Sequence, residues 1–283
     1  MSKIILVAGA WHGLGKFTAE ALALAGYTVY APRPQATGSR NAVSATGFSP
    51  PRRHRLADLR LLDLDVHSQA SVEAAVAQVM AESGRIDVVI HGAGYRAFGP
   101  GKILTPEGFG QLDDMNSLSA GRVNRAVLPH LRRQRQGLVV SVSGGNSGAN
   151  AAQQARQFSR WGIATCIVVP PVATNGAVHA LHARNPADGG LATHRDAGPY
   201  AWFGEPVRRG SSAGYVPSNA DAIAVADAIV DVVDAPFGEV PFRINVGETE
   251  ISPNIGAMAF DGFDNAILHR AVLSEQSTLR VPA

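Results

Sequence analysis

Short runs of apolar residues alternate along most of the chain with longer segments whose apolar residues recur at helical spacing. The first unit covers residues 3–26, with a buried strand at 4–7, a glycine-containing turn, and a helix that Gly26 is placed to end. The expected buried face of this helix consists of Leu14, Phe17, Ala21 and Leu24. The pattern therefore predicts a strand–turn–helix unit at the start of the fold.

The same alternation continues to residue 246, and the largely apolar run at 86–90 is typical of a parallel strand covered by helices on both faces. The further predicted strands are 28–31, 59–66, 86–90, 138–142, 163–169 and 240–246. Helices are expected between them, because parallel neighbours need crossover connections. The chain is predicted to form a doubly wound α/β fold with a parallel sheet of about seven strands.

Helix ends are marked by capping residues. Ser68 is the predicted N-cap and Gly84 the predicted C-cap of a helix whose apolar side carries Val72, Val76, Val79 and Met80. Thr105 and Pro106 are expected to begin a helix that runs to about residue 133. A polar cluster at 218–221 is expected to start a later helix with Ile223, Ile229, Val230 and Val233 on its apolar side.

Composition narrows the function classes. The chain has 283 residues, 46% of them hydrophobic, which suits one large domain with an ample core, and no linker divides it. A formal net charge of +2 with 17% charged residues gives no field that would recruit nucleic acid or an acidic membrane. Because no apolar run reaches spanning length and no signal peptide is recognisable, a cytoplasmic protein that binds small molecules is expected.

Neither a cysteine nucleophile nor a metal site is predicted. Cys166 is the only cysteine, so no intrachain disulfide can form, and its place in the apolar run 163–169 indicates a small core residue. His179 and His182 have a spacing compatible with one helical face, but no carboxylate or cysteine at a matching spacing completes a metal site.

Gly9, Gly13 and Gly15 follow the first predicted strand in the spacing G-x-x-x-G-x-G. Glycines permit a turn that aims a helix N-terminus at the end of the strand, and they let a pyrophosphate approach the backbone N–H groups. The alternative is a tight turn in a fold that binds no nucleotide.

Arg33 is the first charged residue after the predicted strand 28–31. In dinucleotide-binding folds this position meets the adenosine ribose, where an acid accepts from the 2′-OH and an arginine pairs with a 2′-phosphate. If a dinucleotide binds, NADP(H) is favoured over NAD(H). The alternative is a solvated loop arginine.

The order of these motifs resembles that of the classical short-chain dehydrogenases/reductases from residue 1 to about 246. The matching positions are Gly9, Gly13 and Gly15, Asp65-Val66, Ala93-Gly94, Asn116 within 114–116, the strand at 137–143, Trp161-Gly162-Ile163, and 170–174. The resemblance implies one Rossmann-type domain over 1–283, with an insertion at about 174–215 over the substrate and a further segment at 251–283.

The resemblance also implies where a cofactor and a partner subunit would bind. Asp65 and Val66 would contact the adenine, and the glycine turn with Ala93, Gly94 and Thr174 would complete the cofactor site. Relatives usually dimerise through the helices near 109–133 and 150–160. Since the second helix is expected to be short here, the implied homodimer is weaker or altered.

The sequence departs from the family pattern mainly at the positions of the catalytic residues. The family uses a tyrosine as proton donor, a lysine four residues on that lowers the tyrosine pKa, and a serine that orients the substrate. Here Gly144 stands in the serine's place, no lysine follows Lys102, and no tyrosine lies between Tyr95 and Tyr200. The segment 144–161 holds little more than a crossover helix of roughly 13 residues, so the catalytic turn is expected to be absent.

Two bulky residues also enter the glycine turn, where the family has small serines. Trp11 would either stack on a ligand or fill the space that the phosphates need, so the sequence leaves dinucleotide binding open. His12 stands beside it as a titratable group.

Other polar residues follow the predicted strands, at the edge where open α/β folds place their ligands. His91 is the leading acid–base residue, because it follows a central strand, and Asn116 and Ser143 are expected to orient the substrate. His12 is the alternative acid–base group. For each histidine the other interpretation is a hydrogen-bonded structural residue.

Three functional classes follow. The first is a redox-neutral enzyme, such as an isomerase, cyclase or lyase, that acts on a small carbonyl compound. The second is an NADP(H)-dependent oxidoreductase that takes its proton from His91, water or another group. The third is a non-catalytic relative that senses a ligand or pairs with an active partner.

Overall fold

The computed structural model describes residues 2–9, 14–33, 58–92, 110, 114–142, 148–170 and 219–246. Within them lies a seven-stranded sheet in the order β3-β2-β1-β4-β5-β6-β7, and every neighbouring pair is parallel. The strands are β1 (Ile4–Ala8), β2 (Thr28–Pro32), β3 (Leu59–Leu62), β4 (Val88–His91), β5 (Gly137–Val142), β6 (Ile163–Val169) and β7 (Arg243–Asn245). The predicted doubly wound sheet is confirmed.

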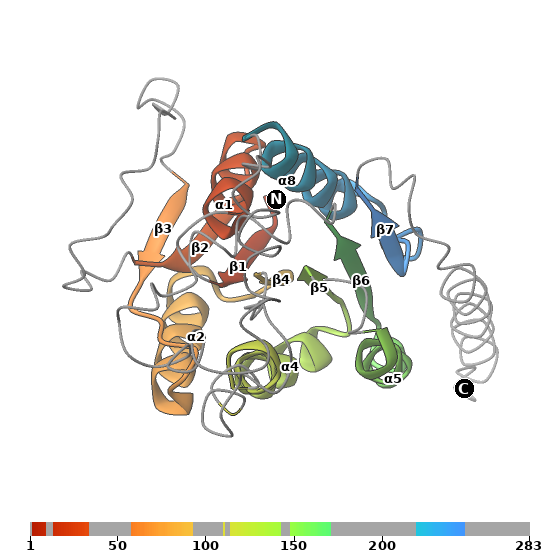
Figure 1. Ribbon diagram of the computed structural model, residues 1–283. Coiled ribbons are helices and arrows are strands. Elements are labelled where there is room, and N and C mark those ends of the chain that lie inside the picture. Colours follow the sequence, from red (N-terminus) through yellow and green to blue (C-terminus); the bar gives the residue numbers. More distant parts are fainter. Residues whose placement is uncertain are drawn as a thin grey trace, which may run out of the picture.

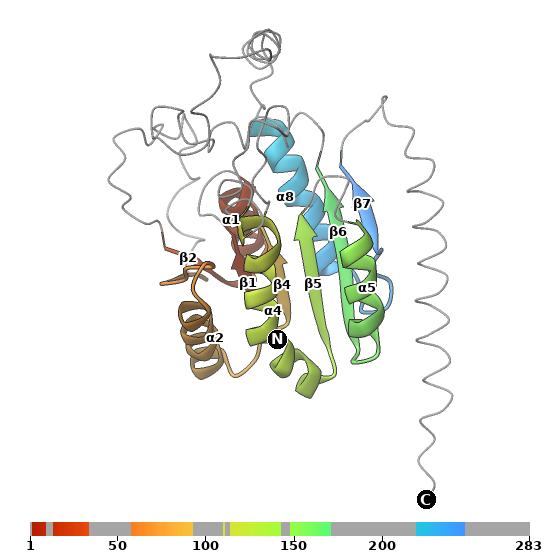
Figure 2. The ribbon, with the colours of Figure 1, turned by 60° about the horizontal axis from the view of Figure 1, so that its bottom comes forward.

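Helices cover both faces of this sheet (Figure 1). On one face lie α1 (Leu14–Leu24) and α8 (Asn219–Asp234). The opposite face carries α2 (Gln69–Ser83), α4 (Ser119–Gln134) and α5 (Gly148–Ser159), which run alongside the strands in Figure 2. A π-helical turn, η2 (Asp114–Leu118), leads directly into α4. No helix in the described part of the chain is long and apolar enough to cross a bilayer.

Alternate residues of each central strand enter different cores, as expected for parallel strands buried on both faces. Ile5 and Val7 of β1 pack toward α1 and α8. Leu6 and Ala8 pack on the other side, toward α2 and α4. This alternation also fixes the direction of the last residue of β4, because Val89 packs toward α4 and His91 follows it by two.

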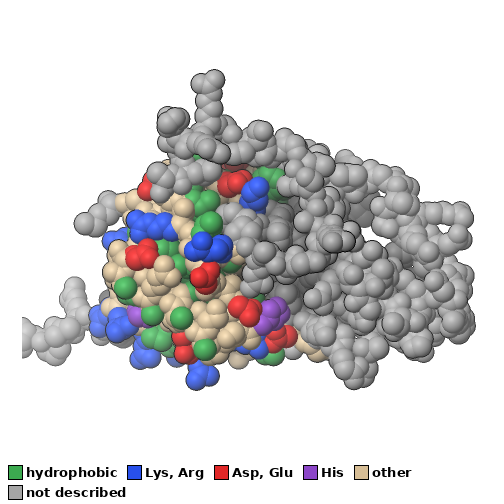
Figure 3. Space-filling model, turned by 90° about the vertical axis from the view of Figure 1, so that its left-hand side faces the viewer, with side chains coloured by type: hydrophobic (Ala, Val, Ile, Leu, Met, Phe, Trp, Pro, Cys, Tyr) green, Lys and Arg blue, Asp and Glu red, His purple; other side chains and the backbone are tan. Residues whose placement is uncertain are grey.

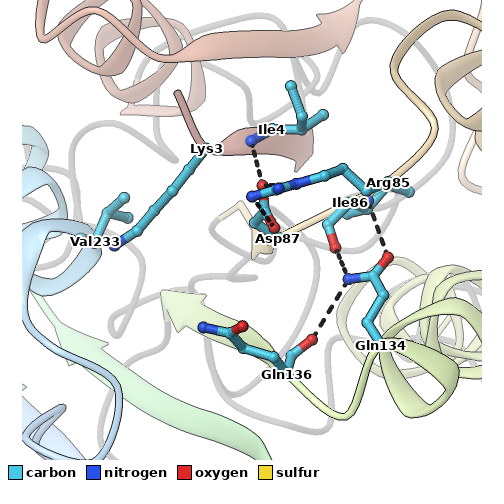
Figure 4. Close-up of polar contacts among 8 residues, drawn as sticks. All are labelled: Lys3, Ile4, Arg85, Ile86, Asp87, Gln134, Gln136 and Val233. Carbon is cyan, nitrogen blue, oxygen red and sulfur yellow. Dashed lines mark hydrogen bonds and ion pairs between the residues drawn. The ribbon is translucent and has the colours of Figure 1, made fainter. Parts of the chain in front are cut away.

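Polar contacts at the amino ends of the strands fasten the layers together (Figure 4). The Asp87 carboxylate accepts from the Ile4 N–H at 2.7 Å and from the Arg85 guanidinium at 3.0 Å. The Gln134 side chain donates to the Ile86 carbonyl at 2.7 Å and accepts from the Ile86 N–H at 3.3 Å, which ties α4 to the start of β4. Lys3 donates to the carbonyl of Val233, near the end of α8. These contacts thus connect the amino ends of β1 and β4 to each other and to α4 and α8.

Both predicted caps of α2 are confirmed. The Ser68 side chain accepts from the Ser71 N–H at 3.3 Å. Gly84 adopts the left-handed region with φ 71°, and its N–H donates to the Met80 carbonyl at 2.9 Å. Helix α5 has 12 residues, in line with the short crossover expected after β5.

The predicted strand 59–66 is too long, because β3 ends at Leu62. The chain then leaves the sheet, since the Asp65 N–H donates to the Ser71 side chain at 3.0 Å and the Asp65 carbonyl accepts from the Ser68 N–H at 3.1 Å. Leu64 is nevertheless buried, which extends the apolar pattern beyond the strand. The strands predicted at 86–90 and 240–246 likewise have shifted or shorter bounds in β4 and β7.

Two apolar helical residues face solvent instead of the core. Leu24 is 41% exposed, and the buried side of α1 consists of Leu14, Thr18, Ala19, Leu22 and Ala23. Ile223 is 37% exposed, whereas Ile229 and Val233 of the same helix are buried as predicted. Helices α1 and α8 pack on each other, and Leu22 of α1 and Ile229 of α8 are fully buried in the core that they share. The predicted insertion at 174–215 and the segment 251–283 lie outside the described residues.

Candidate functional site at the carboxyl ends of β1 and β4

The crossovers of the sheet reverse direction between β1 and β4, and open α/β folds bind ligands at the carboxyl end of such a point. Here the backbones of the two strands touch just beyond their ends. A Cβ on Gly9 would lie 2.8 Å from the Gly92 Cα, and a Cβ on Gly92 would lie 2.9 Å from the Gly9 Cα. The Gly92 N–H donates to the Ala8 carbonyl at 3.0 Å. Glycine is therefore required at both positions by their mutual contact.

His91 lies beside this contact, in register with Ala8 of β1 and Ser141 of β5. Its side chain is 7% exposed, and its Nε2 lies 2.8 Å from the Asn124 Oδ1 of helix α4. Because an amide oxygen only accepts hydrogen bonds, Nε2 carries the proton and Nδ1 is the acceptor in the neutral ring. Asn124 is itself buried, as are Val123, Val127 and Leu131 of the same helix.

Burial lowers the pKa of His91, and the hydrogen bond to Asn124 raises it by a smaller amount. The net shift is downward from the ordinary value of 6.5. The ring is therefore neutral at neutral pH. In this environment it can accept a proton only at a cost in solvation, and it holds a fixed tautomer and orientation.

The loop after β3 forms the next part of the site. The Asp65 carboxylate accepts from the His67 N–H at 3.0 Å in a local turn. The Val66 carbonyl accepts from the Arg122 guanidinium of α4 at 3.3 Å. This loop, which the sequence assigns to adenine contact, is therefore attached to α4.

Asp114 is the centre of this attachment. Its carboxylate lies 2.5 Å from the Arg122 Nη2 and 2.5 Å from the His67 Nδ1. The hydrogen bonds from Arg122 and then His67 are the main causes of a lowered Asp114 pKa. Asp114 is also the first residue of the π-helical turn η2, which carries Asn116. Such turns frequently occur at functional sites, and this one is held to the loop after β3.

Arg33 follows the end of β2, where its N–H donates to the Leu62 carbonyl of β3 at 2.7 Å. Its Nε lies 3.0 Å from the Asp63 Oδ1. The side chains of Arg33 and Asp63 are 59% and 89% exposed. The residue expected to meet a 2′-phosphate is therefore already paired with the carboxylate that directly follows the neighbouring strand β3.

The described residues include part of the predicted site. Gly9, His91, Arg33 and the Asp65–Val66 pair lie at the carboxyl edge, and Gly15 lies in the first turn of α1. The other predicted residues lie outside the described part of the chain: His12, Gly13, Ala93, Gly94, Ser143 and Thr174. Of Asn116 the structure gives the position in η2.

Sequence reasoning missed several residues of this edge. Asn124 carried a usable signal, since it is a polar residue at a position that helical spacing puts on the buried face of α4. The sequence around Asp63 and His67 gave no such signal, because their partners Arg33 and Asp114 lie 30 and 47 residues away in the chain. Cys166 is buried as predicted, and burial raises its pKa to about 12, so it is an inert core thiol.

The sequence matches a family model described as short chain dehydrogenase over residues 3–159. Among curated proteins, the 3-ketodihydrosphingosine reductase of Bacteroides thetaiotaomicron is 32% identical over 141 residues, which are 50% of this chain and 46% of that protein. The match thus spans about half the length of that relative.

Solved structures share the fold. A short-chain dehydrogenase from Streptomyces avermitilis superposes with a TM-score of 0.62 at 24% identity, covering 99% of this chain and 98% of that one. An actinorhodin polyketide ketoreductase solved with NADPH gives a TM-score of 0.59 at 21% identity, covering 87% of this chain and 95% of that one. These matches confirm the fold expected from the sequence motifs.

Proposed function

The chain belongs to the short-chain dehydrogenase family, and from that premise we propose that it binds NADP(H) and acts as an oxidoreductase on a small carbonyl compound without a tyrosine–lysine pair. When bound, NADP(H) supplies or accepts the hydride. The observation that carries the proposal is the cationic Arg33 at the end of β2, beside the loop after β3. An arginine in this position suits a 2′-phosphate.

The residues around this corner support the fit. Gly9 and Gly92 let the ends of β1 and β4 approach each other closely at the switch point of the sheet, where this class of fold binds its cofactor. Asp65 and Val66 lie in the loop that would face the adenine, and Arg122 holds that loop against α4. The actinorhodin polyketide ketoreductase, which was solved with NADPH, shares the fold.

The proton must come from a group other than the family's tyrosine. The chain has no lysine after Lys102 and no tyrosine between Tyr95 and Tyr200, and Gly144 replaces the serine. Loss of a positioned proton donor typically costs about 10² to 10⁴ in rate. Turnover by positioning alone is therefore slow, with water as the proton source.

A second function is favoured by one observation, the buried imidazole at the end of a central strand. His91 would act there as a base in a redox-neutral reaction on a carbonyl compound, with Asn116 and Ser143 as orienting groups. Its burial and its bond to Asn124 favour a fixed role over direct proton transfer. We therefore place this function second.

The test measures binding and turnover separately. Tryptophan fluorescence is expected to report NADPH binding, and NADPH absorbance to report slow oxidation with a panel of ketones and aldehydes. Conversion without cofactor is then measured for the wild type and for His91→Gln, whose amide can still donate to Asn124. Absence of NADPH binding would overturn the first function. Fast cofactor-free conversion that His91→Gln abolishes, in a protein that remains folded, would establish the second.

A further inference from the structure

The adenosine corner of the proposed cofactor site contains a residue of opposite charge to Arg33. Asp63 is the first residue after β3, and its carboxylate lies 3.0 Å from the Arg33 Nε. The two residues meet because Pro32 of β2 is in register with Leu62 of β3, which brings the residues that follow side by side. This β3 edge of the molecule carries acidic and basic side chains close together (Figure 3).

We propose that Asp63 is a specificity-determining residue that weakens the preference of this protein for NADP(H) over NAD(H). The inference rests on the proposed function, namely dinucleotide binding with the adenosine ribose beside Arg33. A 2′-phosphate that approaches the guanidinium must compete with the Asp63 carboxylate for it. A ribose without the phosphate does not meet this competition.

The magnitude follows from the exposure of the pair. Ion pairs between exposed groups are weak, so their loss changes an equilibrium by about two- to five-fold at low salt. Asp63→Asn is therefore expected to tighten binding of the 2′-phosphorylated ligand by about that factor, and to leave the other ligand unchanged. The gain is expected to shrink as salt is added, because exposed charges are screened.

The experiment measures two ligands that carry no nicotinamide, 2′-phospho-ADP-ribose and ADP-ribose, by titration calorimetry on the full chain. The dissociation constant of ADP-ribose divided by that of 2′-phospho-ADP-ribose isolates the contribution of the 2′-phosphate, and this ratio rises when the phosphorylated ligand binds more tightly. Asp58→Asn is the matched control, because Asp58 is an exposed acid at the opposite end of β3 and its side-chain charge change is identical. It lies about five strand residues, or roughly 16 Å, from Asp63, which exceeds the screening length at moderate salt.

The expected result is a higher ratio in Asp63→Asn, no change in Asp58→Asn, and a ratio near one in both Arg33→Gln and the double variant Arg33→Gln/Asp63→Asn. Loss of the Asp63 effect in the double variant shows that Asp63 acts through Arg33. If neither ligand binds the wild type, the proposed function itself fails. If both bind and Asp63→Asn leaves the ratio unchanged or lowers it, this inference alone is overturned.

Discussion

His91 and Asn124 form a hydrogen bond with each other in the protein interior, so removal of one side chain leaves the other without this partner. Asn124→Ala leaves the buried Nε2 hydrogen without an acceptor, and we expect a loss of about 1–3 kcal/mol in the free energy of unfolding. Arg125→Ala, at the exposed neighbouring position of α4, is the control and should cost less than about 0.5 kcal/mol. Urea denaturation of both variants checks this. Equal losses would show that the buried hydrogen bond contributes nothing specific.

The lowered pKa of His91 predicts how stability depends on pH. Below the ordinary value of 6.5 the unfolded chain binds a proton that the folded protein does not, so this contribution is complete above that pH and declines as the pH falls below it. His91→Gln removes the titrating group. The stability of this variant should therefore fall less than that of the wild type between about pH 7.5 and 5. Parallel stability curves for the two proteins would contradict the assignment.

Two glycines at the ends of secondary-structure elements adopt the left-handed backbone conformation, one after α2 and one before β6, and their surroundings differ. Gly84 at the end of α2 has open space around an added Cβ, whereas at Gly162, before β6, a Cβ would lie 2.3 Å from the Arg135 carbonyl oxygen. Gly84→Ala should cost about 1–2 kcal/mol for its backbone conformation. Gly162→Ala adds a collision with backbone and should cost about 3 kcal/mol or more. Thermal unfolding compares them, and a smaller loss for Gly162→Ala would refute the close approach.

The attachment of η2 to the loop after β3 depends on Asp114. Hydrogen bonds from Arg122 and His67 lower its pKa, so its stabilising effect is present above the ordinary value of 3.8 and is lost as the pH falls through the lower folded value. Asp114→Asn should cost about 1 kcal/mol at neutral pH, and the difference from the wild type should vanish in acid. Hydrogen exchange should show faster opening of 114–118 in the variant. Unchanged exchange there would mean that the turn is held by other contacts.

At the scale of the whole molecule, charge bears on self-association. Helices α4 and α5 lie side by side on one face of the sheet (Figures 1 and 2), and exposed positions there carry Arg125, Arg132, Arg133, Arg156 and Arg160. The chain has no acidic residue from 115 to 187. Two copies that met through this face would therefore bring like charges together.

We expect a monomer, or a weak dimer, at low ionic strength and more dimer when salt screens the arginines. Light scattering at about 0.05 M and 0.5 M salt measures the change. A stable tetramer at both concentrations would contradict this prediction.

Much of the architecture could be predicted because it depends on local pattern. The bounds of β6 match the apolar run 163–169, and both caps of α2 were recognisable from Ser68 and Gly84. The candidate site was harder to predict from the sequence. His91 and Arg33 could be placed at the right edge, but the partners that define their chemistry, Asn124 and Asp63, come from other elements.

Residue type and spacing are enough to predict the order of strands and helices along the chain, the family, and the absence of a tyrosine–lysine pair in the second half. The contact of Gly9 with Gly92, the burial of His91 against Asn124 and the pairing of Arg33 with Asp63 became visible only in the folded protein. The reason is physical. Burial and charge pairing depend on atoms far apart in the chain, and only the packing of parallel strands brings them within hydrogen-bonding distance.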